Sequence, residues 1–217
     1  MTSMATPCED MAAVRRVAAG DREHWGELLR RYHDRLRNTV MLRLDRRLQG
    51  RVDASDIMQE ASLDAFSRLS EYAREADPMP FFLWLRFLTL QRLQIVHRHY
   101  LGTKARDGAR DVSIQGAQGP GASSLALAEQ LLGRDTRASQ IAIRAERALR
   151  LQEALDSMDP TDREVLTLRN FEQLSNAECA RVLGLSESAA TKRYIRALRR
   201  LKEILAALPG GMSEFRP

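Results

Sequence analysis

Hydrophobic residues recur every three or four positions along most of this 217-residue chain, which is the period of an amphipathic α-helix. One stripe comprises Trp25, Leu28, Leu29, Tyr32, Leu36, Val40 and Leu44. A second stripe, preceded by Asp53 or Ser55 as the N-cap, comprises Ile57, Ala61, Leu63, Ala65, Phe66 and Leu69. Asp77-Pro78-Met79-Pro80 interrupts the pattern, because proline disfavours helical geometry in the preceding residue, and a third helix is predicted from Phe81 to about Tyr100. Alternating β-branched runs are missing, so the pattern predicts an all-α fold.

The stretch from Gly102 to Gly133 differs from the rest of the chain: it holds six of the twelve glycines and no aromatic residue. A segment with so few apolar side chains cannot offset the entropy lost on ordering, so we expect a flexible linker, with a short helix near Leu125 to Leu132 as an alternative within it. Helical signals resume at Ile141. We therefore predict two small helical domains, residues 1–105 and 141–217, joined by a linker at 106–140.

Helix start signals are dense in the C-terminal domain. Asp159-Pro160 provides an N-cap followed by proline at the first helical position, with a capping box at Thr161 and Glu164 as an overlapping alternative. Ser175-x-x-Glu178 is a second capping box. Gly184 then supplies a tight turn before the last helix, and this sequence of helix, glycine turn and longer helix is typical of a helix-turn-helix unit.

The last helix has two different faces when its residues are placed at about 100° intervals. We expect one face to pack inward: Ala190, Tyr194, Ala197, Leu198 and Leu201. From Lys192 to Lys202 there are six basic residues and no acidic one. Charges of one sign repel along a helix, and a phosphate backbone would relieve that repulsion, so this helix indicates nucleic-acid binding, as does the net charge of +5.

Other classes of protein are disfavoured. The most apolar run, PFFLWLRFLTL, is too short to cross a bilayer. Two cysteines do not make a disulfide framework, and His97 and His99 would not share a helix face, so we expect a soluble cytoplasmic protein with no metal site. The sequence shows no P-loop, no paired-carboxylate pocket and no nucleophile–histidine set, so we expect neither enzymatic activity nor a cofactor.

Several stretches together resemble the extracytoplasmic-function (ECF, group IV) sigma factors of the sigma-70 family. They are VRRVAAGDREHWGELLRRY, ASDIMQEASLDAFSRL, FFLWLRFLTLQRL and DPTDREVLTLRNFEQLSNAECARVLGLSESAATKRYIRALRRLKEIL. They follow the family's order, with a linker where the family has one. The resemblance implies a region 2 domain, which binds core RNA polymerase and recognises and melts the −10 element, and a region 4 domain, which recognises the −35 element.

The resemblance also implies roles for particular residues. Asp56, Gln59 and Glu60 would dock on the β′ clamp helices of the polymerase. Seven acidic and two basic residues between Val52 and Met79 make such a surface suitable for a basic protein partner. The β subunit and promoter DNA would be further partners, and an anti-sigma factor is a common one in this family.

DNA contacts are implied in both domains. The −10 residues would be Tyr72, Gln91, Arg92, Gln94 and Arg98, and Trp84 is expected to pack rather than stack on a base. The −35 residues would be Ser188, Thr191, Lys192, Arg193, Ile195 and Arg196, with Arg169 and Asn176 holding phosphates and setting the angle of the helix. Two alternatives stay open: a stand-alone helix-turn-helix regulator and an all-helical protein-interaction module.

Overall fold

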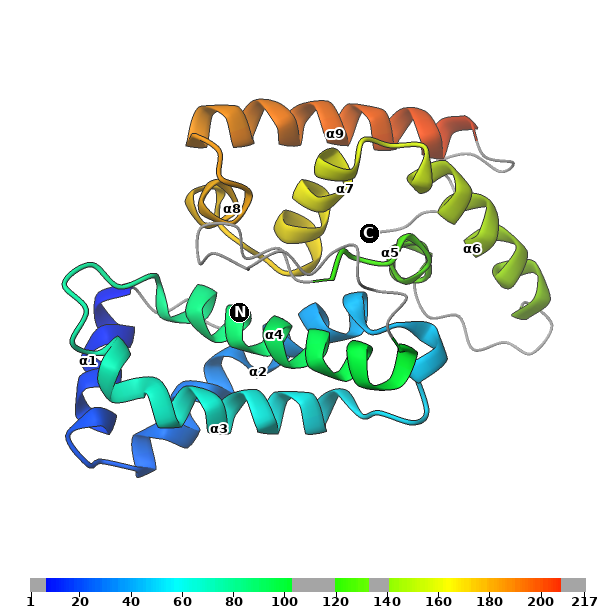
Figure 1. Ribbon diagram of the computed structural model, residues 1–217. Coiled ribbons are helices and arrows are strands. Elements are labelled where there is room, and N and C mark those ends of the chain that lie inside the picture. Colours follow the sequence, from blue (N-terminus) through cyan, green and yellow to red (C-terminus); the bar gives the residue numbers. More distant parts are fainter. Residues whose placement is uncertain (1–6, 103–119, 133–140, 208–217) are drawn as a thin grey trace. The chain divides into compact units, whose positions relative to one another are not determined.

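The computed structural model describes residues 7–102, 120–132 and 141–207, which form an all-α protein as predicted. The chain divides into two compact units, residues 1–120 and 121–217 (Figure 1). The described residues contain no β-strand, only an isolated bridge between Gln49 and Val52. Most of the expected linker lies outside the described residues, and the predicted domain boundaries stay a prediction.

The described residues of the first unit form four α-helices and one short 3-10 turn. They are α1 (Pro7–Ala18), α2 (Glu23–Arg43), η1 (Arg46–Leu48), α3 (Ala54–Tyr72) and α4 (Phe81–Leu101). Of the two N-caps expected for the second helix, the chain uses Asp53, whose carboxylate accepts the Ser55 N–H at 2.8 Å. The predicted third helix is confirmed as α4, which starts directly after Pro80.

Aromatic packing joins α2, α3 and α4 at the N-terminal end of α4. The ring centroid of Phe81 lies 5.9–6.2 Å from those of Trp25, Tyr32, Tyr72 and Trp84. Such tilted and edge-on arrangements add to the stabilisation that burial itself provides. This cluster holds the three helices in fixed relation, so that their outer faces present defined sets of side chains.

Two residues of the second predicted stripe do not lie in the core. Leu63 is 71% exposed, and Phe66 is also exposed, although its ring contacts Trp25 with the centroids 5.6 Å apart. The buried stripe of α3 is narrower than expected and runs through Ile57, Ala61, Ala65, Leu69 and Tyr72. The prediction for Leu63 was wrong because the packed face of α3 is formed by residues spaced four apart, Ile57, Ala61 and Ala65, and Leu63 does not share this spacing.

Within the part of the second unit that the structure describes, there are five α-helices and one π-helical turn. They are α5 (Ser124–Leu131), α6 (Ile141–Asp156), α7 (Pro160–Leu166), η5 (Thr167–Phe171), α8 (Asn176–Leu183) and α9 (Glu187–Ala207).

Helix α5 lies inside the range expected to be a flexible linker, where the short helix was the alternative. It packs against α6, with Leu127 and Ala128 buried, and the hydroxyl of Ser124 donates to Asp156 at 2.5 Å. A leucine-rich turn therefore buries enough apolar surface to be ordered, despite its glycine-rich surroundings.

Helix α7 starts as its cap residues predict. The carboxylate of Asp159 accepts the N–H groups of Thr161 at 2.9 Å and Asp162 at 3.1 Å, and Pro160 occupies the first turn. These bonds, foremost the one from the Asp162 N–H, lower the pKa of the Asp159 carboxyl below its usual value. The overlapping capping box at Thr161 is not the one used.

Candidate functional site

Local sequence signals build the helix-turn-helix unit of α8 and α9. Ser175 and Glu178 form the predicted capping box: the Ser175 hydroxyl accepts the Glu178 N–H at 3.2 Å, and the Glu178 carboxylate accepts the Ser175 N–H at 2.7 Å. Helix α8 ends at Gly184, whose φ of 64° is the left-handed conformation that glycine adopts without strain. Figure 1 shows the chain turning there from α8 into α9.

The inward face of α9 is built from alanines, aliphatic residues and one tyrosine. Ala190, Ala197 and Ile204 are buried, and Tyr194 and Leu201 are partly buried, against α7, α8 and α6. Leu198, expected to pack inward, is 38% exposed. That prediction was wrong because the packed stripe is narrow, and the residue after Ala197 lies about 100° around the helix.

The opposite face of α9, which we call the reading face, consists of Ser188, Thr191, Lys192, Ile195 and Arg196. All five side chains are exposed, and Ile195 is 51% exposed despite being aliphatic. The Thr191 hydroxyl donates back to the carbonyl of Glu187 at 3.0 Å, which leaves its methyl group and its acceptor lone pairs for a ligand. A phosphate backbone or the edge of a base is the kind of ligand that this mixture of cationic, hydroxyl and methyl groups fits.

Two of the predicted DNA residues on α9, Arg193 and Arg196, form ion pairs with the start of α7. The Arg193 guanidinium donates to Asp159 at 3.1 Å and to Asp162 at 2.9 Å. Arg196 donates to both oxygens of Asp162, from Nε at 3.1 Å and from Nη2 at 3.0 Å, and this carboxylate raises the pKa of the guanidinium. Spacing along the sequence gave no signal for these pairs, because the partners are more than thirty residues apart.

Arg169 and Asn176 also make bonds within the unit. Arg169 donates to the carbonyl of Leu174 at 3.1 Å, and its guanidinium lies over the Tyr194 ring at 5.2 Å. The Asn176 amide donates to the carbonyl of Glu187 at 3.0 Å, which ties the start of α8 to the start of α9. These contacts are suited to setting the angle of α9, and phosphate contact by either residue stays a prediction.

In the first unit, Asp56, Gln59 and Glu60 lie exposed on α3, as the sequence pattern implied. Leu63, four residues after Gln59, shares this surface, and we call the four residues the α3 face. Sequence reasoning had placed Leu63 in the core. Its spacing of seven residues from Asp56 was the signal that could have placed it on the acidic face instead.

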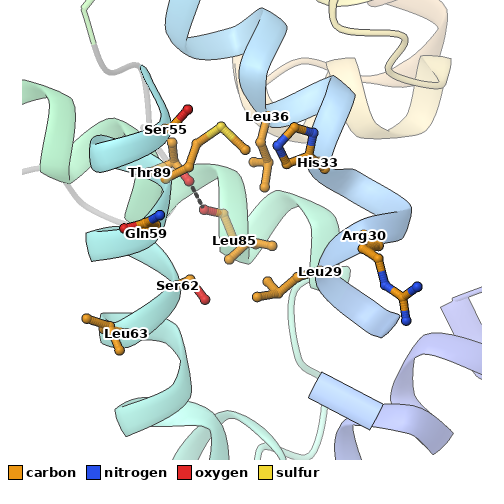
Figure 2. Close-up of a pocket in the computed structure, with 11 residues that line it drawn as sticks. Leu29, Arg30, His33, Leu36, Ser55, Gln59, Ser62, Leu63, Leu85 and Thr89 are labelled. Atoms are coloured by element: carbon orange, nitrogen blue, oxygen red, sulfur yellow. Dashed lines mark hydrogen bonds between the residues drawn. The ribbon is translucent and has the colours of Figure 1, made fainter. Parts of the chain in front are cut away.

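A groove of about 450 Å³ lies between α2 and α3 beside the α3 face (Figure 2). Leu29, Leu36, Met58 and Leu85 give it an apolar lining, and Gln59 and Leu63 lie along its α3 side. On the α2 side are Arg30 and His33. A groove of this kind accommodates apolar side chains from a partner helix.

Glu60 and Arg92, to which the resemblance gave different partners, form an ion pair between α3 and α4. Both side chains are partly exposed, so the pair contributes at most about 1 kcal/mol. Gln91 and Gln94 of α4 are partly exposed, and Arg98 is exposed on the same side of the helix. Ile95 is an exposed aliphatic residue beside them that sequence reasoning did not identify.

Tyr72 is not available for direct base contact. Its side chain is 2% exposed and stacks on Trp84, with the centroids 4.3 Å apart and the rings inclined by 21°. The Tyr72 hydroxyl donates to the carbonyl of Met79 at 2.5 Å. We therefore correct the sequence-based role: Tyr72 holds the loop before α4, and Trp84 packs against it as expected.

Among the described residues, no group of three or more histidine, cysteine, aspartate or glutamate side chains is arranged to hold a metal ion. His97 instead accepts the backbone N–H of Asp45 at 3.2 Å through Nε2, and burial lowers its pKa. None of the helices in the described ranges is both long and apolar enough to span a bilayer.

Comparison with known proteins gives matches over the helix-turn-helix unit and over most of the chain. The family described as Sigma-70, region 4 matches residues 148–201, which include the helix-turn-helix unit. RNA polymerase sigma factor NccH of Alcaligenes xylosoxydans xylosoxydans is 27% identical over 204 residues, covering 93% of this chain and 97% of that protein. RNA polymerase sigma-E factor of Streptomyces coelicolor is 43% identical over 63 residues, covering 29% of this chain and 35% of that protein.

A solved structure shares the fold. The structure of CnrH in complex with the cytosolic domain of CnrY matches with a TM-score of 0.54 and 22% identity, covering 92% of this chain and 99% of that one. CnrH of Cupriavidus metallidurans is named an RNA polymerase sigma factor, and its sequence is 28% identical over 201 residues.

Proposed function

We propose that the chain is an ECF sigma factor of the sigma-70 family and that its two units divide the work of promoter-specific initiation. The first unit binds core RNA polymerase and the −10 element, and the second unit binds the −35 element. The polymerase supplies the chemistry, so this protein acts as a cytoplasmic specificity subunit without catalytic residues of its own.

We assign recognition of the −35 element to the reading face of α9. The observation that carries this assignment is a set of exposed side chains on a helix whose other face packs through Ala190 and Ala197 against the rest of the unit. Such a helix can enter a major groove as a rigid element, because its backbone does not depend on the reading side chains for packing. Lys192 and Arg196 bring positive charge to the phosphates or to guanine, and Ile195 brings an apolar group for a thymine methyl.

We assign the binding of core RNA polymerase to the α3 face. Asp56 and Glu60 give it negative charge within a basic protein, which favours a basic partner helix and disfavours DNA. Leu63 adds an apolar group at the rim of the groove, and removal of this leucine from water would strengthen docking. The β′ clamp helices and the β subunit are the partners proposed for this unit.

We assign binding of the −10 element to the outer side of α4. Gln91, Gln94 and Arg98 present amide and guanidinium groups toward solvent along one side of the helix. Those groups bind base edges and phosphates of an opened strand. Arg92 is tied to Glu60, so we assign it the smaller role of positioning α4 against α3.

An anti-sigma protein is part of the same proposal, because the related CnrH was solved in complex with the cytosolic domain of CnrY. The groove beside the α3 face is the surface where such a protein would compete with the polymerase.

In vitro transcription tests the proposed function. Core RNA polymerase of the source organism is incubated with genomic DNA, with and without the purified chain, and transcript 5′ ends are mapped. The chain is expected to create a set of new start sites that share one sequence motif upstream. No new start sites, with a polymerase that is active with another sigma factor, would contradict the proposal.

A further inference from the structure

Asp162 lies between two arginines of α9 and is itself nearly buried. Its side chain is 10% exposed and accepts N–H groups from Arg196 and Arg193. The carboxylate sits in the first turn of α7, and the Asp162 N–H is held by the Asp159 cap, so its position is set by the α7 backbone. One fixed carboxylate therefore controls the direction of two cationic side chains.

The way Arg196 is held leaves a particular edge of its guanidinium open. Asp162 takes the Nε donor and one Nη2 donor, in the side-on bidentate geometry. A guanidinium has five donors, so Nη1 and the remaining Nη2 hydrogen form a second, outer edge. That edge has no protein partner within the described residues, and the Arg196 side chain is 60% exposed.

The open edge matches one ligand closely. Two parallel N–H donors at the end of an arginine pair with O6 and N7 of guanine in the major groove. An arginine fixed beforehand by a carboxylate loses less rotamer freedom on binding than a freely moving one. The edge belongs to the same exposed face as Thr191, Lys192 and Ile195, so the other reading residues would lie beside it in the groove.

We propose that Asp162 is a positioning residue for promoter recognition, which orients the outer edge of Arg196 toward a guanine of the −35 element. This inference rests on the proposed function of α9. It adds that specificity at one base pair depends on a residue of α7 that does not itself touch DNA. Arg193, bonded to both Asp159 and Asp162, completes the clamp that keeps the carboxylate in place.

The test is a selection experiment with the complete protein in complex with core RNA polymerase. The DNA is a duplex pool in which the segment upstream of the start site is randomised, and bound molecules are sequenced. The variant Asp162→Asn keeps the shape of the side chain but can accept with only one oxygen. The control is Glu203→Gln, which makes the same change of charge on α9 by removing an exposed carboxylate paired with Arg200.

The wild-type protein and Glu203→Gln are expected to enrich the same −35 motif, including one guanine. Asp162→Asn is expected to lose the preference for that guanine by about tenfold, with the other positions retained. In an Arg196→Ala background, Asp162→Asn is expected to cause no further loss, because the carboxylate acts through that arginine. Should Asp162→Asn unfold the unit, Arg196→Lys tests whether the guanidinium held by Asp162 reads the guanine. Lysine keeps the charge but cannot pair with a carboxylate along one edge and with a base along another.

Other outcomes would overturn the inference. Retention of the guanine preference by Asp162→Asn would show that Asp162 does not position Arg196. Retention by Arg196→Lys would show that the outer edge of the guanidinium does not read a base. A uniform loss across all sequences, with a salt dependence lowered by about one phosphate contact, would assign Arg196 to the backbone instead. If the wild-type complex enriches no motif in this segment, the proposed function of α9 fails, and the inference fails with it.

Discussion

Replacement of Leu63 by alanine should weaken the binding of core polymerase without destabilising the protein. The side chain is 71% exposed in the free chain, so it contributes little to folding and can be buried by a partner. Full burial of a leucine stabilises by about 1.5–3 kcal/mol, and 71% of that range is about 1–2 kcal/mol. The dissociation constant should therefore rise roughly 5- to 30-fold.

The assay is fluorescence anisotropy of the labelled chain titrated with core polymerase, together with a thermal melt. Leu198→Ala is the matched control, because it removes the same group from a partly exposed position on α9. It should leave polymerase affinity unchanged. Leu63→Ala should lie within about 1 kcal/mol of the wild type in stability, and Leu198→Ala should lose about 1–2 kcal/mol, because more of its side chain is buried in the fold. An unchanged affinity for Leu63→Ala, or an equal loss for Leu198→Ala, would refute the assignment of the α3 face.

Two further predictions concern the first unit. Burial lowers the pKa of His97 from its ordinary 6.5, so this histidine binds a proton more readily in the unfolded protein than in the folded one. The free energy of unfolding should therefore be highest above pH 6.5 and should fall as the pH drops below 6.5. His97→Gln keeps an acceptor for the Asp45 N–H but does not titrate, so its melting temperature should change less between pH 7.5 and 5.5, and identical pH profiles would contradict this. Tyr72→Phe removes the bond to the Met79 carbonyl and should cost about 1 kcal/mol in urea unfolding while promoter opening persists. Lost opening with unchanged stability would restore Tyr72 as a DNA contact.

Features encoded within a few residues were predictable from the sequence. The caps at Asp159 and Ser175 and the turn at Gly184 each depend on neighbouring residues, and the structure contains all three. The all-α class followed from periodicity in the same way. The resemblance to ECF sigma factors agrees with the comparisons, which match Sigma-70, region 4 to residues 148–201 and a sigma factor that is 27% identical over 204 residues.

Features that depend on contacts between distant segments were not predictable. Leu63 has the spacing of a core residue as well as that of the acidic face, and only the packing of α2 and α4 on α3 decides between them. The pairing of Asp162 with Arg196 joins residues on different helices, and no spacing rule connects them. Tyr72 was assigned to DNA from the family resemblance, whereas its burial depends on Trp84 and Met79.

The central claim is that polymerase binding and −35 recognition belong to different faces on different units. Two variants test it most directly when each is measured in both assays: Asp56→Ala with Glu60→Ala on α3, and Arg196→Ala on α9. The α3 variant should lose affinity for core polymerase, and the polymerase complexes that do form at high concentration should keep the −35 motif. Arg196→Ala should bind polymerase as the wild type does and lose discrimination at the −35 element. If either variant loses both activities while remaining folded, the two tasks are not separable and the account is wrong.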